Sequence, residues 1–182
     1  MILADFGLEI RSGPRAETCF FGVFGKIPGM NSQNHRWKPS VTVAALVERD
    51  GRFLVVEEET SSGLRFNQPA GHMEEGESLV AGCVRETLEE TGCHVTPQTL
   101  VGIYQWTIPA GDITYLRFAF DCQLDQIEAG RPLDAGIVAT HWFSLDELRA
   151  NRDRHRSPLV LQCVEDWVNG RRFPLDAVRH YG

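Results

Sequence analysis

Glutamate is concentrated in one short part of the chain. The stretch 71–93, GHMEEGESLVAGCVRETLEETGC, contains six glutamates and one arginine. Glu86, Glu89 and Glu90 are spaced three and four residues apart, so on a helix their carboxylates are neighbours that repel one another. They also lie in the C-terminal half of the expected helix, where the helix dipole disfavours anions. A hard divalent cation offsets this repulsion and can bridge phosphate oxygens, so the spacing predicts a metal site for phosphate chemistry.

The periodicity of the same stretch predicts a helix over residues 78–91. Small and apolar residues recur at steps of three and four and form one stripe, and Arg85 and the three glutamates project from the opposite side. Gly82 costs the helix roughly 1 kcal/mol relative to alanine, and on the charged side its missing side chain leaves room for a ligand to approach. The alternative is a solvated acidic face, although such faces usually mix charge signs. The stripe consists of Val80, Cys83, Val84, Thr87, Leu88 and Thr91.

These spacings resemble the signature of the Nudix hydrolases, GX5EX7REUXEEXGU, in which U is a bulky apolar residue. Every glycine and charged position is filled, by Gly71, Glu77, Arg85-Glu86, Glu89-Glu90 and Gly92. Thr87 and Cys93 stand at U positions, where both can pack as small, largely apolar groups. Further segments, among them FNQPAGH, YLRFAF and RSPLV, resemble the NudJ-type phosphatase branch, and the resemblance covers about residues 38–176.

The resemblance implies an α/β fold, a Nudix-type α/β/α sandwich with a mixed β-sheet and a loop–helix–loop catalytic motif. It also implies Mg²⁺ as the cofactor, with Mn²⁺ as a substitute. Carried over by position, the metal ligands are the backbone carbonyl of Gly71 and the side chains of Glu86, Glu89 and Glu90.

The resemblance gives the remaining motif residues other roles. Arg85 orients a glutamate, while Glu77 and Gly92 are structural. Eight residues of helix span roughly 12 Å, so Glu77 reaches Arg85 only if its own segment is a loop that folds back. We take Glu86 as the general base, with Asp134 as the rival acid outside the motif; a loop aspartate is also a common turn former.

The activity implied is that of a Mg²⁺-dependent hydrolase and phosphatase. It acts on nucleoside di- and triphosphates and on related pyrophosphates such as hydroxymethylpyrimidine pyrophosphate, and it releases orthophosphate. The alternatives are an ADP-ribose or dinucleotide pyrophosphohydrolase and a non-catalytic nucleotide-binding Nudix module. The expected partner is a small-molecule substrate, and a monomer or a homodimer is expected.

Four residues outside the motif are candidates for substrate binding. Phe66, Tyr104 and Trp106 could stack on a ring, although strand aromatics are more often core residues. Arg117 is an isolated cation on an apolar strand, which favours either a phosphate contact or a surface salt bridge. The sequence shows no set of polar residues arranged to read a base edge, so we expect weak discrimination between bases.

Composition limits the class of protein. The formal net charge is −7, which argues against a general role in coating nucleic acid, because that role needs a basic face. The five cysteines are scattered without a CxxC pair, which is typical of reduced thiols and predicts a cytoplasmic location. No apolar run approaches the roughly 18 residues of a membrane span.

The element pattern begins after residue 36. Strand-like runs over 41–47 and 52–58 flank Asp50-Gly51, a hairpin-turn signal. A second hairpin is expected over 99–122 and a further strand over 137–143, followed by helices with caps at Ser144 and Ser157. We therefore predict a Nudix domain over 37–182. For residues 1–36 we expect an N-terminal extension, which is either an ordered part of the protein or sequence upstream of a true start at Met30.

Overall fold

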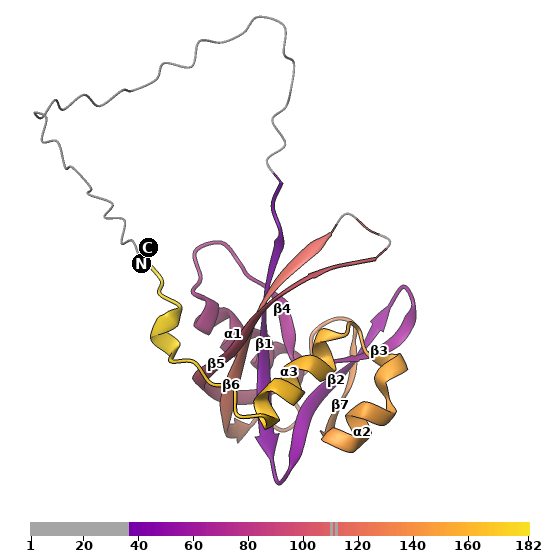
Figure 1. Ribbon diagram of the computed structural model, residues 1–182. Helices are drawn as coiled ribbons and strands as arrows, with labels where there is room; N and C mark the ends of the chain where they lie inside the picture. The colour runs from indigo at the N-terminus through magenta and orange to yellow at the C-terminus, as the bar shows by residue number, and fades with distance from the viewer. Residues whose placement is uncertain (1–36, 110, 112) are drawn as a thin grey trace, which may run out of the picture. The chain divides into compact units, whose positions relative to one another are not determined.

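The computed structural model describes residues 37–109, 111 and 113–182, and residues Trp37–Gly182 form one compact unit (Figure 1). The predictions for residues 1–36 lie outside the described residues. The strands are β1 (Ser40–Arg49), β2 (Arg52–Thr60), β3 (Gly63–Asn67), β4 (Ala70–His72), β5 (Cys93–Thr107), β6 (Thr114–Ile127) and β7 (Ile137–Ser144). The helices are α1 (Leu79–Thr91), α2 (Leu145–Ala150) and α3 (Leu159–Val168), with 3₁₀ turns at Arg152–Arg154 and Leu175–Ala177.

Strand β1 organises the sheet. It runs parallel to β6 and antiparallel to β4, and its far end pairs with β2 through a hairpin. Strand β2 in turn lies between β3 and β7, both antiparallel to it, and β5 pairs with β6. The seven-stranded sheet is therefore mixed, as predicted. At the β1–β2 turn Asp50 and Gly51 have φ values of 53° and 76°, the left-handed conformation that the Asp-Gly signal predicts.

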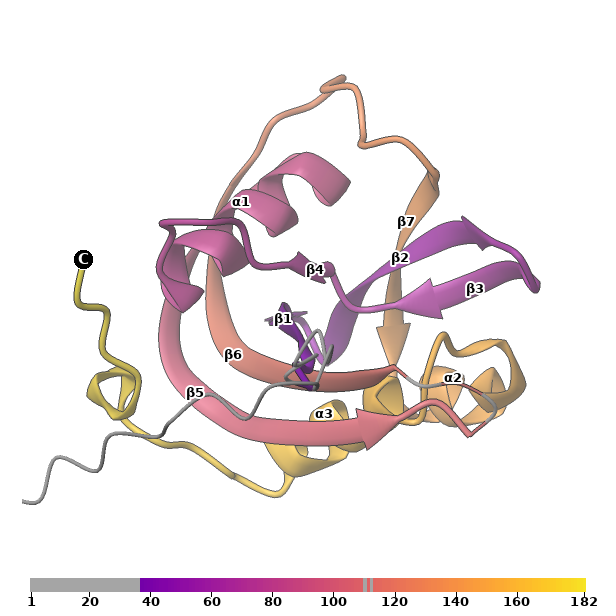
Figure 2. The same ribbon diagram turned by 90° about the horizontal axis from the view of Figure 1, so that it is seen from above.

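Alternating residues of β1 face two different helices. Val43, Ala45 and Val47 pack in the core cluster that contains Cys83 of α1. Leu46 packs in the second cluster, which contains residues of α3. Seen from above, α1 and α3 lie on opposite sides of the sheet (Figure 2). Because successive side chains of a strand point to opposite faces, β1 contributes residues to the hydrophobic core on each face of the sheet. The predicted α/β/α sandwich is confirmed.

The local signals of the C-terminal half are mostly confirmed. Ser144 and Glu147 form a complete capping box at α2. The prediction for α3 was one residue early: Pro158 precedes the helix, and Ser157 Oγ accepts a 3.3 Å hydrogen bond from Leu159 N. Strands β3 and β4 were not predicted from the sequence. No helix in the described part of the chain is long and apolar enough to cross a membrane.

Candidate active site

Helix α1 carries the glutamate cluster, and its ends are set by two local devices. Ser78 Oγ accepts a 3.1 Å hydrogen bond from Ala81 N and caps the start. Gly92 has a φ of 66° and donates its N–H to Leu88 O, which ends the helix in the predicted way. The helix contacts β1, β4 and β5, so its inner side faces the short strand that contains the motif glycine.

Arg85 is the centre of a hydrogen-bonded network. Its Nη2 and Nε donate to the two oxygens of Glu77 at 2.7 and 3.1 Å. Its Nη1 donates to Glu86 Oε1 at 2.9 Å and to Glu89 Oε2 at 3.0 Å. A further bond reaches the backbone oxygen of His72 at 3.1 Å. Glu77 lies in the loop before α1 and folds back, which meets the condition for reaching Arg85, and the guanidinium holds three carboxylates in place.

The alternative of a solvated acidic face is wrong for two of the three glutamates. Glu86 and Glu90 are each only 9% exposed, whereas the Glu89 side chain is 40% exposed. The reason is the close approach of α1 to β4. A Cβ on Gly71 would lie only 2.1 Å from Glu86 Cδ, so the glycine allows the carboxylate to rest directly on the backbone.

Gly82 has a different use from the one expected. It is buried, and a Cβ at this position would lie 2.7 Å from Glu77 Oε1. The space left by its missing side chain is therefore occupied by the Glu77 carboxylate. The glycine allows Glu77 to bond Arg85 rather than admitting a ligand.

Burial changes the acidity of the inner carboxylates. Burial raises the pKa of Glu90 to about 8, and the nearby charges of Glu86, Glu58 and Asp134 reinforce the effect. A 2.8 Å hydrogen bond from Ala70 N opposes it. The pKa of Glu86 is also raised by burial, although its hydrogen bond with Arg85 lowers it. Neighbouring carboxylates that repel one another are stabilised in their ionised forms when a cation binds between them.

The donor chemistry of this cluster fits a hard divalent cation. Carboxylate and backbone oxygens are the ligands that such ions prefer, and Glu86, Glu90 and Gly71 O belong to neighbouring segments. Within the ranges that the structure describes, no three acidic, histidine or cysteine side chains are arranged as a ready coordination set. Arg85 holds Glu86 and Glu89, and Glu90 is bonded to Ala70 N.

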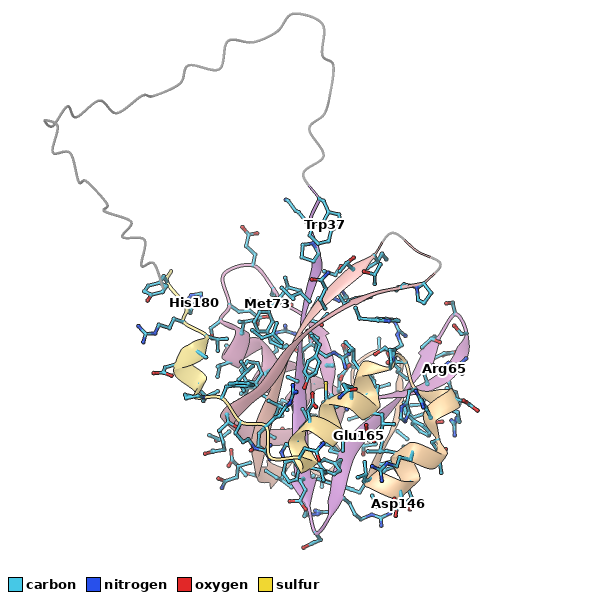
Figure 3. All side chains as sticks on the ribbon, viewed as in Figure 1. Trp37, Arg65, Met73, Asp146, Glu165 and His180 are labelled. Carbon is cyan, nitrogen blue, oxygen red and sulfur yellow. The ribbon has the colours of Figure 1, made fainter. Side chains whose placement is uncertain are left out.

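A pocket of about 700 Å³ extends from the motif glycine. Residues of β1, β2, β3 and β4, of the β5–β6 hairpin and of the segment 156–159 line it. Figure 3 labels Arg65 on β3, one of the lining residues. The volume lies within the range of typical small-molecule sites. One end of the pocket therefore meets the glutamate cluster through Ala70 and Gly71.

The structure separates the four substrate-binding candidates into two pairs. Trp106 and Arg117 line the pocket. Phe66 is 2% exposed and packs in the core, so the core interpretation is correct for it. Tyr104 donates its hydroxyl to Asp166 Oδ2 at 3.0 Å and packs on the α3 side, away from the pocket lining.

Asp134 is both a turn former and a neighbour of the cluster. Its Oδ1 accepts a 2.9 Å hydrogen bond from Ala135 N, and its own N–H donates to Glu89 O at 3.0 Å. Its charge raises the pKa of Glu86 and Glu90, yet it is exposed and does not line the pocket.

Sequence reasoning missed several polar residues of the pocket. Thr42, Glu58 and Asn67 all line it, and none was a candidate. Thr42 is a single polar residue in an apolar run, which gives no sign of the face to which it points. Glu58 is one of three consecutive glutamates, and Asn67 lies in a strand that was not predicted. Only the alternation of β1, once its apolar positions are known, places Thr42 on the face opposite Val43.

Comparisons with known proteins agree with this geometry. The family model described as NUDIX domain matches residues 36–163. Phosphatase NudJ of Escherichia coli (strain K12) is 40% identical over 142 residues, which cover 78% of this chain and 92% of that protein. A solved NUDIX hydrolase from Nitrosomonas europaea is 50% identical with a TM-score of 0.77, covering 79% of this chain and 98% of its own. A MutT NUDIX hydrolase from Burkholderia pseudomallei, 20% identical with a TM-score of 0.62 over 71% of this chain and 98% of its own, shares the fold.

Proposed function

Because the chain belongs to the Nudix hydrolase family, we propose that it is a Mg²⁺-dependent hydrolase of phosphoric anhydride bonds that releases orthophosphate. Its proposed substrates are nucleoside di- and triphosphates and related pyrophosphates such as hydroxymethylpyrimidine pyrophosphate. The likeness to Phosphatase NudJ over 78% of the chain supports this choice within the family.

The observation that carries the proposal is the Arg85 network at the end of the pocket. Arg85 bonds Glu77, Glu86 and Glu89, and Glu86 rests on the backbone of Gly71. A network that holds buried anions together without enough positive charge is unfavourable by itself. It becomes favourable when a divalent cation and a phosphate group complete it.

When bound, such a cation would supply Lewis-acid chemistry at the phosphate and make a water molecule more acidic. We assign Glu86, Glu89, Glu90 and the carbonyl of Gly71 as its ligands. Arg85 keeps Glu86 oriented, and Glu77 keeps Arg85 in position through two hydrogen bonds.

The general base must take a proton from the attacking water. Glu86 is the better candidate, because it is buried beside Gly71 at the end of the pocket, and burial raises its pKa towards the working range of a base. Asp134 remains the outside alternative, although its exposed side chain caps a turn.

Two alternatives are less well supported. An ADP-ribose pyrophosphatase from Streptococcus suis is 21% identical with a TM-score of 0.56, which indicates a shared fold alone. A non-catalytic nucleotide-binding module needs no complete glutamate set, whereas this chain contains every charged residue of the motif.

Product analysis with Mg²⁺ tests the proposal. Nucleoside triphosphates should yield orthophosphate rather than pyrophosphate. Glu86→Gln and Glu90→Gln should each lower turnover by roughly a hundredfold or more, while the control Glu165→Gln, on the outer helix α3, retains it. Trp106→Ala should raise KM and leave the products unchanged. Pyrophosphate as the main product, or ADP-ribose cleaved about tenfold faster than any triphosphate, would contradict the proposed substrate class.

A further inference from the structure

Three buried polar atoms in the same pocket have no hydrogen-bond partner. They are Thr42 Oγ1, Glu58 Oε1 and Arg117 Nε, and all three residues line the pocket described above. Among the described residues the other such atoms belong to His155 alone. Buried polar groups in folded proteins nearly always have a partner. All three belong to residues that line one pocket, so a ligand in that pocket is the candidate for the missing partner.

Strand pairing places two of these residues side by side. Thr42 of β1 and Arg117 of β6 are direct partners in the parallel ladder. The guanidinium is fixed by amide oxygens, donating to Gln68 Oε1 and Asn67 Oδ1 at 3.2 Å each. Arg117 is only 7% exposed, and no carboxylate in the described part of the chain lies within 4.0 Å of its nitrogens. The Cys163 thiol of α3 is a further neighbour of the guanidinium, and Nε is the atom left without a partner.

Glu58 gives the same pocket an acceptor. Its Oε2 lies 3.4 Å from Arg156 Nη1, whereas Oε1 is buried and unpaired. Burial lowers the pKa of Arg117, and Cys163, Glu58 and Glu90 oppose this effect in that order. The lining of the pocket thus includes an arginine held by two amide oxygens and a carboxylate with one unpaired oxygen.

We propose that Thr42, Glu58 and Arg117 form a subsite that reads the edge of an amino-substituted heterocycle. A ring nitrogen would accept from Arg117 or Thr42, and the exocyclic amino group next to it would donate to Glu58. Cytosine and adenine present this pattern, whereas uracil and hypoxanthine present the reverse. A phosphate group fits less well, because Glu58 would repel it. The subsite deepens the proposed function, on which it rests for the identity of the pocket.

The aromatic wall of the pocket suits a planar ring. Trp106 and Tyr115 are cross-strand partners whose rings stack with an interplanar angle of 16° and a centroid distance of 6.1 Å. Both line the pocket. A stacked pair of this kind offers a flat surface to any ring, so stacking supplies affinity and the polar subsite supplies the choice between bases.

Binding without catalysis separates this inference from the hydrolase proposal. Calorimetry in EDTA would compare CMP with UMP and AMP with IMP, pairs that differ at the ring edge and carry the same phosphate. The full-length protein should bind the amino-substituted member at least about tenfold more tightly.

Variants test the residues themselves. Glu58→Gln should remove or reverse the preference, because its amide can donate to the carbonyl of uracil. Thr42→Val should weaken CMP binding by about three- to tenfold with an unchanged or higher melting temperature, since an unpaired buried hydroxyl is lost. The control Glu165→Gln, on α3 (Figure 3), should bind all four ligands like the wild type.

The outcomes are distinct. Equal affinity of the wild type for CMP and UMP, or a preference that survives both substitutions, would overturn the subsite and leave water as the partner of the three atoms. If the preference is present but no orthophosphate is released with Mg²⁺, the subsite stands and the proposed hydrolase function fails.

Discussion

Replacing Glu90 by glutamine is expected to stabilise the metal-free protein above neutral pH. Glu90 Oε2 accepts a hydrogen bond from Ala70 N, and an amide oxygen can accept the same bond. Burial, reinforced by the charges of Glu86, Glu58 and Asp134, raises the pKa of Glu90 from 4.5 to about 8. The folded state therefore binds this proton more tightly than the unfolded chain. The stability contributed by this tighter proton binding is fully present below pH 4.5. It is lost as the pH rises from 4.5 through 8, by about 1.4 kcal/mol per pH unit in that range.

Glutamine does not ionise, so the variant avoids this loss. Its free energy of unfolding should exceed that of the wild type by roughly 3 kcal/mol at pH 7 and by 4–5 kcal/mol at pH 9, and the two should agree near pH 4.5. Urea unfolding in EDTA at several pH values measures the difference. The control variant is Glu89→Gln, which loses a partly exposed ion pair with Arg85. This substitution should lower the free energy of unfolding by about 0–1 kcal/mol at every pH.

Adding Mg²⁺ should reverse the order of stability. A ligand that binds only the folded state stabilises it by linkage, and the wild type has one more anionic oxygen donor than Glu90→Gln. A wild type that is more stable than this variant in EDTA at pH 9, or a difference that does not change with pH, would refute the reasoning.

Three further outcomes are expected. Gly71→Ala should lower turnover by roughly a hundredfold or more while circular dichroism stays native, because its Cβ would lie 2.1 Å from Glu86 Cδ and displace that carboxylate; near wild-type turnover would contradict the assigned position. Tyr104→Phe should cost about 1 kcal/mol of stability through the lost bond to Asp166 with KM unchanged, and a raised KM would return Tyr104 to the substrate site. A chain that begins at Met30 should fold and hydrolyse substrate as the full chain does, and a loss of more than about 2 kcal/mol in urea unfolding would show that the preceding residues pack on the domain.

Local features of the sequence predicted the elements of the motif well. The helix over 78–91 begins and ends where Ser78 and Gly92 place it, because caps act within a few residues of the chain. The Asp50-Gly51 turn and the Ser144 capping box are local for the same reason. The charged and glycine positions of residues 71–92 were enough to indicate the family and its phosphate chemistry.

The positions of the side chains relative to other strands depend on the tertiary structure. The charge pattern of α1 was compatible with an exposed acidic face, and only its packing against β4 buries Glu86 and Glu90. Strands β3 and β4 were missed because pairing with β2 and β1, rather than their own short sequences, holds them.

The pocket is the clearest case of this dependence. Thr42, Glu58 and Arg117 are far apart in the sequence, and the sheet brings them to the lining of the same pocket. The sequence alone determined the helix, its caps and the charged motif, because these rest on contacts between residues close in the chain. The tertiary structure decided which carboxylates are buried and which polar residues line the pocket, because strand register and helix packing depend on contacts between distant segments.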